Sequence, residues 1–204
     1  MKNEFITISF LIKDNSRVLD VGCGDGELMK FLAKQKTKDI RGLEISKKNV
    51  QDCISKGLTV IEGDAEYDLK QFPNQSFDYV ILNQTLQAFL NPENVINELL
   101  RVGKRAIVTI PNFGYWRVRL KLLITGKMPV TKNLPNEWYD TPNLHMCTIK
   151  DFFDFCVDRK IKISDALAIK NQKNIDIYKN SKITKVNLEY QNLISELGIF
   201  LIKK

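Results

Sequence analysis

The sequence predicts an α/β fold: a three-layer sandwich around a mostly parallel sheet of seven strands, with an antiparallel strand at one edge. Three observations support this prediction. Short, almost continuously apolar segments alternate with segments whose apolar residues recur at helical spacing. A glycine-rich turn directly follows the first apolar segment, and the length of 204 residues suits a single domain. Strands joined by helical crossovers pair in parallel through right-handed connections.

Seven segments are predicted to be strands. Five of them are nearly continuous in apolar residues, as is typical of parallel strands buried on both faces: 17–21, 40–45, 58–62, 77–82 and 105–110. Residues 161–169 alternate weakly between apolar and polar side chains and are predicted to be a sixth strand. Residues 197–202 are predicted to close the sheet as its antiparallel edge strand.

Helices are predicted between and after these strands, at residues 27–36, 46–56, 91–100, 115–124 and 148–156. Three of them carry recognisable start signals. Ser46 is a suitable N-cap, and Asn91 is followed by a proline at the first helical position. Thr148 has an acidic residue three positions later, which is a capping-box pattern with aspartate in the usual place of glutamate.

The chain shows no internal repeat, and we expect one domain over residues 1–204. Within it, residues 16–112 form the strand-helix core, residues 113–148 a helix and a long loop, and residues 149–204 a C-terminal helix with edge strands. A loop as long as residues 125–147 is usually functional or disordered. Residues 170–192 are rich in lysine and asparagine and give no readable pattern.

Composition excludes several classes of protein. The hydrophobic fraction of 44% and the charged fraction of 27% rule out a disordered tail, a fibre and a coiled coil. No run approaches the ~18 apolar residues of a membrane span, and the first 15 residues make a poor signal peptide. The four cysteines lack the paired spacing of a zinc site or disulfide framework, and there is one histidine, so no metal site is expected. These features predict a reduced, cytoplasmic protein.

The positive charge of the chain is local. Between Arg101 and Lys132 the sequence has eight basic residues and no acidic residue, whereas the rest of the chain has 23 basic and 24 acidic residues. A local basic surface suggests an anionic partner or ligand. Trp116 beside Arg117 and Arg119 could stack on bases and contact phosphates, but a single such helix without a recognised module does not favour a nucleic-acid partner.

The sharpest motif is the turn at residues 20–26 (DVGCGDG), directly after the first predicted strand. Glycines at alternate positions allow a tight turn and a close approach of a ligand. A dinucleotide motif would have its third glycine one residue later, where Glu27 stands. The carboxylates of Asp20, Asp25 and Glu27 disfavour a pyrophosphate and favour a cationic ligand, such as S-adenosylmethionine with its sulfonium and ammonium groups.

Acidic residues at successive strand ends extend this site. In open parallel sheets the ligand lies beyond the carboxyl ends of the strands. Glu44 ends the second predicted strand, where a carboxylate can accept hydrogen bonds from ribose hydroxyls, and Asp64 and Ala65 follow the third, where an adenine edge could lie. Cys23 is interpreted as a small filler, because nearby carboxylates raise a thiol pKa. The cofactor-binding residues predicted to this point are Asp20, Gly22, Cys23, Gly24, Gly26, Glu44, Ile45, Asp64 and Ala65.

Residues 18–112 resemble the Rossmann-like fold of class I S-adenosylmethionine-dependent methyltransferases. Four stretches resemble one family more closely, the methionine biosynthesis protein MetW family: 18–28 (VLDVGCGDGEL), 84–88 (QTLQA), 111–119 (PNFGYWRVR) and 128–148 (MPVTKNLPNEWYDTPNLHMCT). This resemblance covers residues 15–165, and the last two stretches lie outside the general cofactor motifs. It implies a role in methionine synthesis with a homoserine O-acyltransferase (MetX) as partner, and it leaves methyl transfer open.

The methyltransferase resemblance adds Asn83 to the predicted cofactor-binding residues, near the transferred methyl group, and assigns no catalytic residue. Gln87 stands where many small-molecule methyltransferases carry histidine, and an amide is a poor base. His145 is the one histidine; with Tyr139 and Asp140 it could form a polar lid, or the whole loop could dock a partner.

Two functions therefore remain open. One is a partner that binds S-adenosylmethionine or S-adenosylhomocysteine and activates or regulates the acyltransferase. The other is an active methyltransferase for a small metabolite. We expect the acyltransferase to bind at residues 101–132 and the loop that follows, because arginine and aromatic residues are enriched at interface centres.

Overall fold

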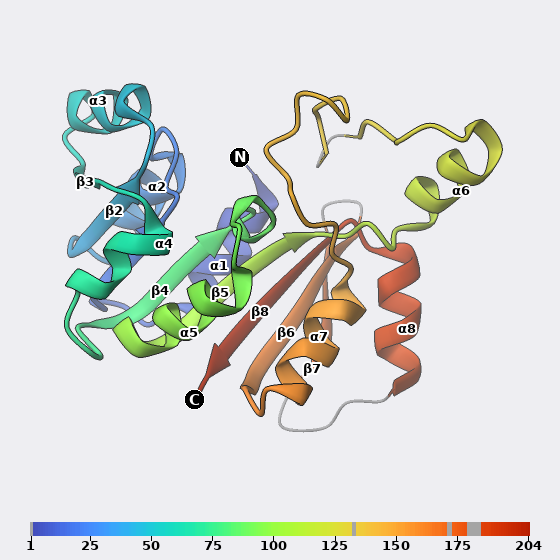
Figure 1. Cartoon of the computed structure of the whole chain (residues 1–204). Helices are drawn as coiled ribbons and strands as arrows, with labels where there is room; N and C mark the ends of the chain where they lie inside the picture. Colours follow the sequence, from blue (N-terminus) through green and yellow to red (C-terminus); the bar gives the residue numbers. More distant parts are fainter. Residues whose placement is uncertain (1, 132–133, 171–172, 179–184) are drawn as a thin grey trace.

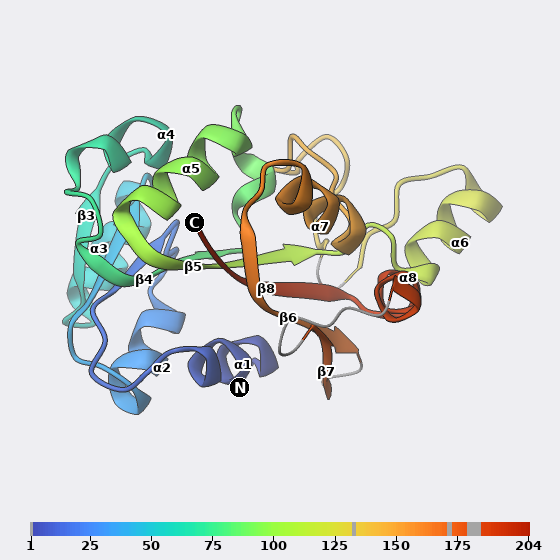
Figure 2. The same cartoon turned by 90° about the horizontal axis from the view of Figure 1, so that it is seen from below.

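The computed structural model describes residues 2–131, 134–170, 173–178 and 185–204. Within them, one sheet runs in the order β3-β2-β1-β4-β5-β8-β6-β7, with helices on both faces (Figure 1 and Figure 2). The predicted α/β class is confirmed. The strands are β1 (Val18–Val21), β2 (Ile40–Glu44), β3 (Thr59–Glu62), β4 (Phe77–Asn83), β5 (Gly103–Pro111), β6 (Lys162–Lys170), β7 (Lys173–Tyr178) and β8 (Leu197–Lys203).

The five strands β1 to β5 pair in parallel, and β8 is antiparallel to both of its neighbours, β5 and β6. The prediction that residues 197–202 form the edge of the sheet is wrong. All of these residues are buried, because β8 has a strand on each side and helices over both faces. The edge is instead β7, which pairs antiparallel with β6 and gives the sheet an eighth strand.

Helices α1 (Asn3–Leu11), α2 (Glu27–Gln35) and α3 (Lys47–Ser55) cover one face, and α4 (Ala65–Asp68), α5 (Pro92–Val102) and α7 (Ile149–Asp158) cover the other (Figure 2). The predicted start signals are confirmed. Ser46 accepts a hydrogen bond from the Asn49 N–H, Asn91 accepts one from the Asn94 N–H, and the capping box of Thr148 is complete. Helix α1, whose Phe5 and Ile8 are buried against the sheet, was not predicted from the sequence.

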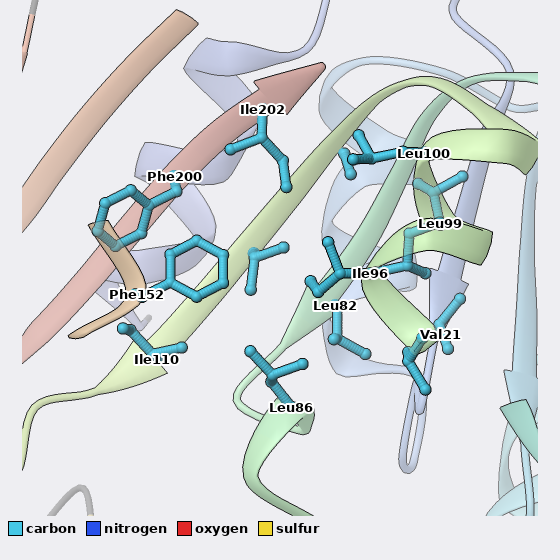
Figure 3. Packing of buried hydrophobic residues seen from close by; sticks show 14 of the residues in the cluster. Val21, Leu82, Leu86, Ile96, Leu99, Leu100, Ile110, Phe152, Phe200 and Ile202 are labelled. Atoms are coloured by element: carbon cyan, nitrogen blue, oxygen red, sulfur yellow. The ribbon is translucent and has the colours of Figure 1, made fainter. Parts of the chain in front are cut away.

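Each face of the sheet has its own core. Under α5 and α7, Leu82, Ile96 and Leu99 pack together, and the rings of Phe152 and Phe200 lie 4.7 Å apart between centroids (Figure 3). Under α1 and α2 a second cluster is built mostly from aliphatic side chains of the opposite face of the sheet, together with Tyr79. Because both faces are covered, chemistry on the parallel part of the sheet is confined to its ends.

Four further helices belong to the described residues, and three of them contribute buried side chains to the core under α5 and α7. The short helices η1 (Leu69–Gln71) and η2 (Leu86–Ala88) lie before and after β4, and α8 (Lys185–Ile194) precedes β8. Helix α6 (Trp116–Thr125) projects away from the sheet (Figure 1 and Figure 2). Lys132, the end of the predicted basic segment, lies outside the described residues, as do residues 171–172 and 179–184 of the stretch 170–192 that gave no pattern. Over the ranges given above, no helix is long and apolar enough to cross a bilayer.

Candidate functional site

The register of the parallel strands gathers the predicted site at one edge of the sheet. Val21 at the end of β1 is level with Leu43 of β2 and with Leu82 of β4, and Glu44 is level with Glu62 of β3. The carboxyl ends of four strands therefore lie side by side. The turn 20–26 and the residues that follow β2, β3 and β4 all leave the sheet at this edge.

The glycine turn leaves room at its centre. Gly22, Gly24 and Gly26 have positive φ values of 66°, 56° and 79°, which residues other than glycine rarely adopt. A Cβ atom on Gly22 would lie 2.8 Å from the side chain of Thr85, whereas one on Gly24 would have no atom within 4 Å. Gly22 and Gly26 are therefore required by packing, while the open side of Gly24 is space that a ligand can enter.

Glu44 fixes the second strand end to this turn. Its Oε2 accepts a hydrogen bond from the Gly24 N–H at 2.8 Å, and its Oε1 accepts one from the Ser46 N–H at 2.9 Å. The side chain of Asn49 donates a longer bond of 3.4 Å to the same Oε1. A buried carboxylate held by backbone donors has a fixed direction, and its remaining lone pairs can accept bonds from ligand hydroxyl groups.

Asp20 is the most unusual group of the site. It is 1% exposed, and neither carboxylate oxygen has a hydrogen-bond partner among the described residues. Burial, with a smaller contribution from the charge of Glu44, raises the pKa of Asp20 to about 8. A buried carboxyl without a partner is costly unless a ligand completes its contacts, so this site fits a cationic group.

Asp64 and Ala65 lie where β3 gives way to α4. Asp64 is the N-cap of α4, since its Oδ1 accepts a hydrogen bond from the Glu66 N–H at 2.9 Å. Its own N–H donates to Asp68 Oδ2 at 2.7 Å, and Ala65 is buried. Ile45, next to Glu44, has a side chain that is 66% exposed and offers an apolar surface at the same edge.

Asn83 and Cys23 have partners within the protein. Asn83 Oδ1 accepts a 2.6 Å hydrogen bond from the hydroxyl of Thr109, which also accepts one from the Gln84 N–H. Cys23 is buried beside Gly42, and burial together with the charge of Asp20 raises its thiol pKa far above the ordinary value. An inert thiol agrees with the interpretation of Cys23 as a filler.

A cavity of about 960 Å³ lies beside the glycine turn, lined by residues of α1, α2 and the end of β4. Glu4 and Glu27 line it, together with Gln84 and Pro135 of the long loop. The side-chain amide of Gln84 donates a 2.8 Å hydrogen bond to Glu4 Oε2. Glu4 was not predicted as a site residue because α1 was not predicted, although the apolar residues 5, 8 and 12 follow helical spacing.

The long loop contacts η2 close to this edge. The backbone carbonyl of Gln87 accepts hydrogen bonds from the N–H groups of Leu144 and His145, at 2.7 and 3.0 Å. The side chain of Gln87 is buried, and neither of its polar atoms has a partner among the described residues. His145 itself is exposed, as are Tyr139 and Asp140, so these three side chains do not form a closed polar lid in this structure.

The basic segment does not form one surface. Arg101 donates hydrogen bonds to the carbonyls of Leu69 and Phe72 and pairs with Glu98, so it holds η1 against α5. Lys104 lies at the amino end of β5, whereas α6 begins beyond its carboxyl end. The nine residues of β5 span about 30 Å at ~3.3 Å per residue. The basic residues near the amino end of β5 therefore lie far from the basic residues of α6.

Helix α6 carries the exposed part of this segment. Leu123 is 82% exposed and Ile124 is 72% exposed, while Val118 is buried against the rest of the protein. The guanidinium of Arg117 lies 5.3 Å from the centre of the Trp116 ring. Arg119 has a local role instead, since its Nε donates a 2.6 Å hydrogen bond to the carbonyl of Gly114.

The order of the parallel strands, the glycine turn and the acidic strand ends define a class I S-adenosylmethionine-dependent methyltransferase fold. A S-adenosylmethionine-dependent methyltransferase from Archaeoglobus fulgidus is similar, with a TM-score of 0.66 and 18% identity over all of this chain and 92% of that chain. The cyclase SpnF is also similar, with a TM-score of 0.65 and 18% identity over 99% of this chain and 80% of that chain. The fold alone therefore does not establish methyl transfer.

The chain belongs to the family described as methionine biosynthesis protein MetW, whose model matches residues 2–202. This match confirms the resemblance seen in the four sequence stretches. The bifunctional methionine biosynthesis protein MetXA/MetW of Rhodopirellula baltica is 34% identical over 164 residues. That alignment covers 76% of this chain and 26% of the relative, so the chain spans about a quarter of the relative's length.

Proposed function

We propose that this chain binds S-adenosylmethionine or S-adenosylhomocysteine at the edge formed by β1 to β4, as a single MetW domain. The observation that carries the proposal is the carboxylate of Glu44, held by the Gly24 N–H at the open side of the glycine turn. The unpartnered carboxyl of Asp20 beneath the turn supports a ligand that brings a positive charge.

Each predicted residue has a role in this proposal. Asp20 faces the cationic end of the ligand, Gly24 lets the chain pass close to it, and Gly22 and Gly26 give the turn the shape that holds it. Glu44 accepts hydrogen bonds from the ribose hydroxyls, with Ile45, Asp64 and Ala65 beside the adenine. Cys23 packs beneath the turn, and Asn83 lies near the sulfur. When bound, S-adenosylmethionine supplies an electrophilic methyl group.

Calorimetry of the wild type and of Glu44→Gln tests the site. Hydrogen bonds to a charged group contribute roughly 1.5–3 kcal/mol each, so the substitution should weaken binding about tenfold or more. Glutamine retains an acceptor for one of the two backbone N–H groups and turns its NH2 toward the other, so the variant's unfolding temperature is measured alongside its affinity. Glu62→Gln is the matched control, because Glu62 is level with Glu44 on the exposed strand β3 and should bind as the wild type does. Absence of binding of either ligand to the wild type at millimolar concentration overturns the proposal.

We further propose that the chain is the partner, and the activator or regulator, of a homoserine O-acyltransferase (MetX). The name of the relative, MetXA/MetW, joins the two activities in one polypeptide, which supports their association. Exposed aliphatic residues with arginine and tryptophan on α6 fit an interface centre with an acidic facing surface. We place the contact on α6 and the following loop rather than on all of residues 101–132.

A second candidate function is methyl transfer to a small metabolite. The cavity beside the glycine turn favours it, because this cavity presents the carboxylate of Glu4 next to Gln84. Such a carboxylate can orient an amine acceptor or take its proton. Formation of S-adenosylhomocysteine from S-adenosylmethionine and a metabolite extract, absent in Glu4→Gln, would support this function over a regulatory one.

A further inference from the structure

A second cavity, of about 450 Å³, lies on the face of the sheet that α1 covers, toward the amino ends of β4 and β5. Apolar side chains form much of its wall, and three charged residues line it, two cations and one anion. Its lining includes Phe10, Ile12, Tyr79, Arg105, Asp165 and Leu167. Its volume falls within the range of about 300–1,000 Å³ that is typical of small-molecule sites.

A β-bulge turns Asp165 toward this cavity. Ile163 is paired with Ile202, but Asp165 is paired with the next residue of β8, Leu201, so one extra residue stands between them on β6. Ile163 packs in the core under α7, whereas Leu201 packs in the core on the α1 side. Without the bulge, alternation would put Asp165 on the same face as Ile163. Bulges that redirect a side chain are enriched beside functional sites.

Arg105 supplies the positive charge. Its guanidinium lies 6.0 Å from the centre of the Tyr79 ring, and Tyr79 is level with it on β4. Arg105 and Asp165 are both half-buried, and in the described part of the chain neither forms an ion pair. Lys13 adds a further cation at the rim. A cation and an anion that share a cavity without pairing leave both charges available to a ligand.

We propose that this cavity binds a small zwitterion, namely an α-amino acid with an apolar side chain. The guanidinium of Arg105 receives the carboxylate, and the carboxylate of Asp165 receives the ammonium group. The apolar wall formed by Phe10, Ile12 and Leu167 covers the side chain. A ligand with only one charge leaves the opposite protein charge without its partner, and this difference provides specificity.

This site is separate from the proposed cofactor site. Arg105 is the third residue of β5, and its neighbour Tyr79 is the third residue of β4, whereas the glycine turn lies beyond the other end of the parallel strands. An amino acid bound here therefore does not compete with S-adenosylmethionine. The inference does not depend on the proposed function.

The test measures binding of L-leucine, L-methionine and L-phenylalanine to the full chain by calorimetry and by ligand-observed NMR. Two analogues of leucine each lack one charge: isoamylamine has no carboxylate, and 4-methylpentanoate has no ammonium group. We expect at least one of the three amino acids to bind. Each of the two single-charge analogues should bind more weakly than leucine, by about tenfold or more. Saturating S-adenosylhomocysteine should not displace it.

Variants assign the binding to the two charges. Arg105→Gln and Asp165→Asn should each weaken amino-acid binding about tenfold or more. Lys104→Gln is the matched control, since it removes a cation from the opposite face of the same strand and should bind as the wild type does. Unchanged unfolding temperatures verify that the variants fold. The proposal is overturned if none of the three amino acids binds at millimolar concentration, if single-charge analogues bind equally well, or if both variants retain wild-type affinity.

Discussion

The titration of Asp20 offers a quantitative test of the cofactor site. Its pKa of about 8 in the free chain means that the carboxyl is mostly protonated at neutral pH. A bound cation favours the charged form, so binding must first displace this proton. The affinity for S-adenosylhomocysteine, whose amino group is its one cation, should therefore rise as the pH increases from 6 to 8. The gain is about tenfold per pH unit below the pKa and levels off above it.

Calorimetry in buffers of different ionisation enthalpy measures the proton release directly. At pH 7 the wild type should release about one proton on binding, beyond any proton that the ligand itself loses. Asp20→Asn has no carboxyl and should release only the ligand's proton. Affinity that is independent of pH, or equal proton release by the wild type and the variant, would refute the assignment of Asp20 to the cationic end of the ligand.

The same shift governs the stability of the free chain. Because the folded-state pKa lies above the ordinary value of 3.8, the protonated group favours folding at low pH, and this stabilisation is lost as the pH rises from about 4 to about 8. Each unit in that window corresponds to about 1.4 kcal/mol. Asp20→Asn removes this dependence, so its unfolding temperature should exceed that of the wild type above pH 7 while its ligand affinity is lower.

Two further predictions concern the neighbouring elements. Replacing both Arg117 and Lys121 with glutamate should weaken a complex with homoserine O-acyltransferase by about tenfold or more, measured as a salt-dependent pull-down. The control variant, Lys38→Glu with Lys48→Glu, should bind as the wild type does. Equal retention of both variants would place the interface away from α6. Gln87→Met should raise the free energy of unfolding by roughly 1–3 kcal/mol, because it removes two buried polar atoms that lack partners among the described residues. A lower free energy of unfolding would show that the amide is hydrogen-bonded in solution.

The site at the sheet edge could be predicted from the sequence because local patterns determine it. A parallel strand that is buried on both faces is recognisable as an apolar run, and the residue after the run lies at the carboxyl edge. Glu44 and Asp64 were placed in this way. Register then brings consecutive strand ends together, and the hydrogen bond between Glu44 and the turn follows from that proximity.

The rest depends on contacts between residues that are distant in sequence. The position of β8 between β5 and β6 cannot be read from its own residues, since an apolar run is compatible with an inner strand as well as an edge. The helix α1 lacks a strongly polar face, so its pattern was less distinct than that of α5. Glu4 comes to the site with that helix, 80 residues away from the Gln84 that it contacts.

The basic segment shows why a charge count along the chain does not define a surface. Arg101, Lys104 and Arg105 are close in sequence, yet one holds η1, one pairs with Asp78 and one stacks on Tyr79. Strand alternation separates Lys104 from Arg105, because neighbouring residues point to opposite faces. The length of β5 separates all three from α6. Reversing Arg105 should therefore leave a partner on α6 unaffected, whereas reversing Arg117 should leave amino-acid binding unaffected, and this pair of variants distinguishes the two sites.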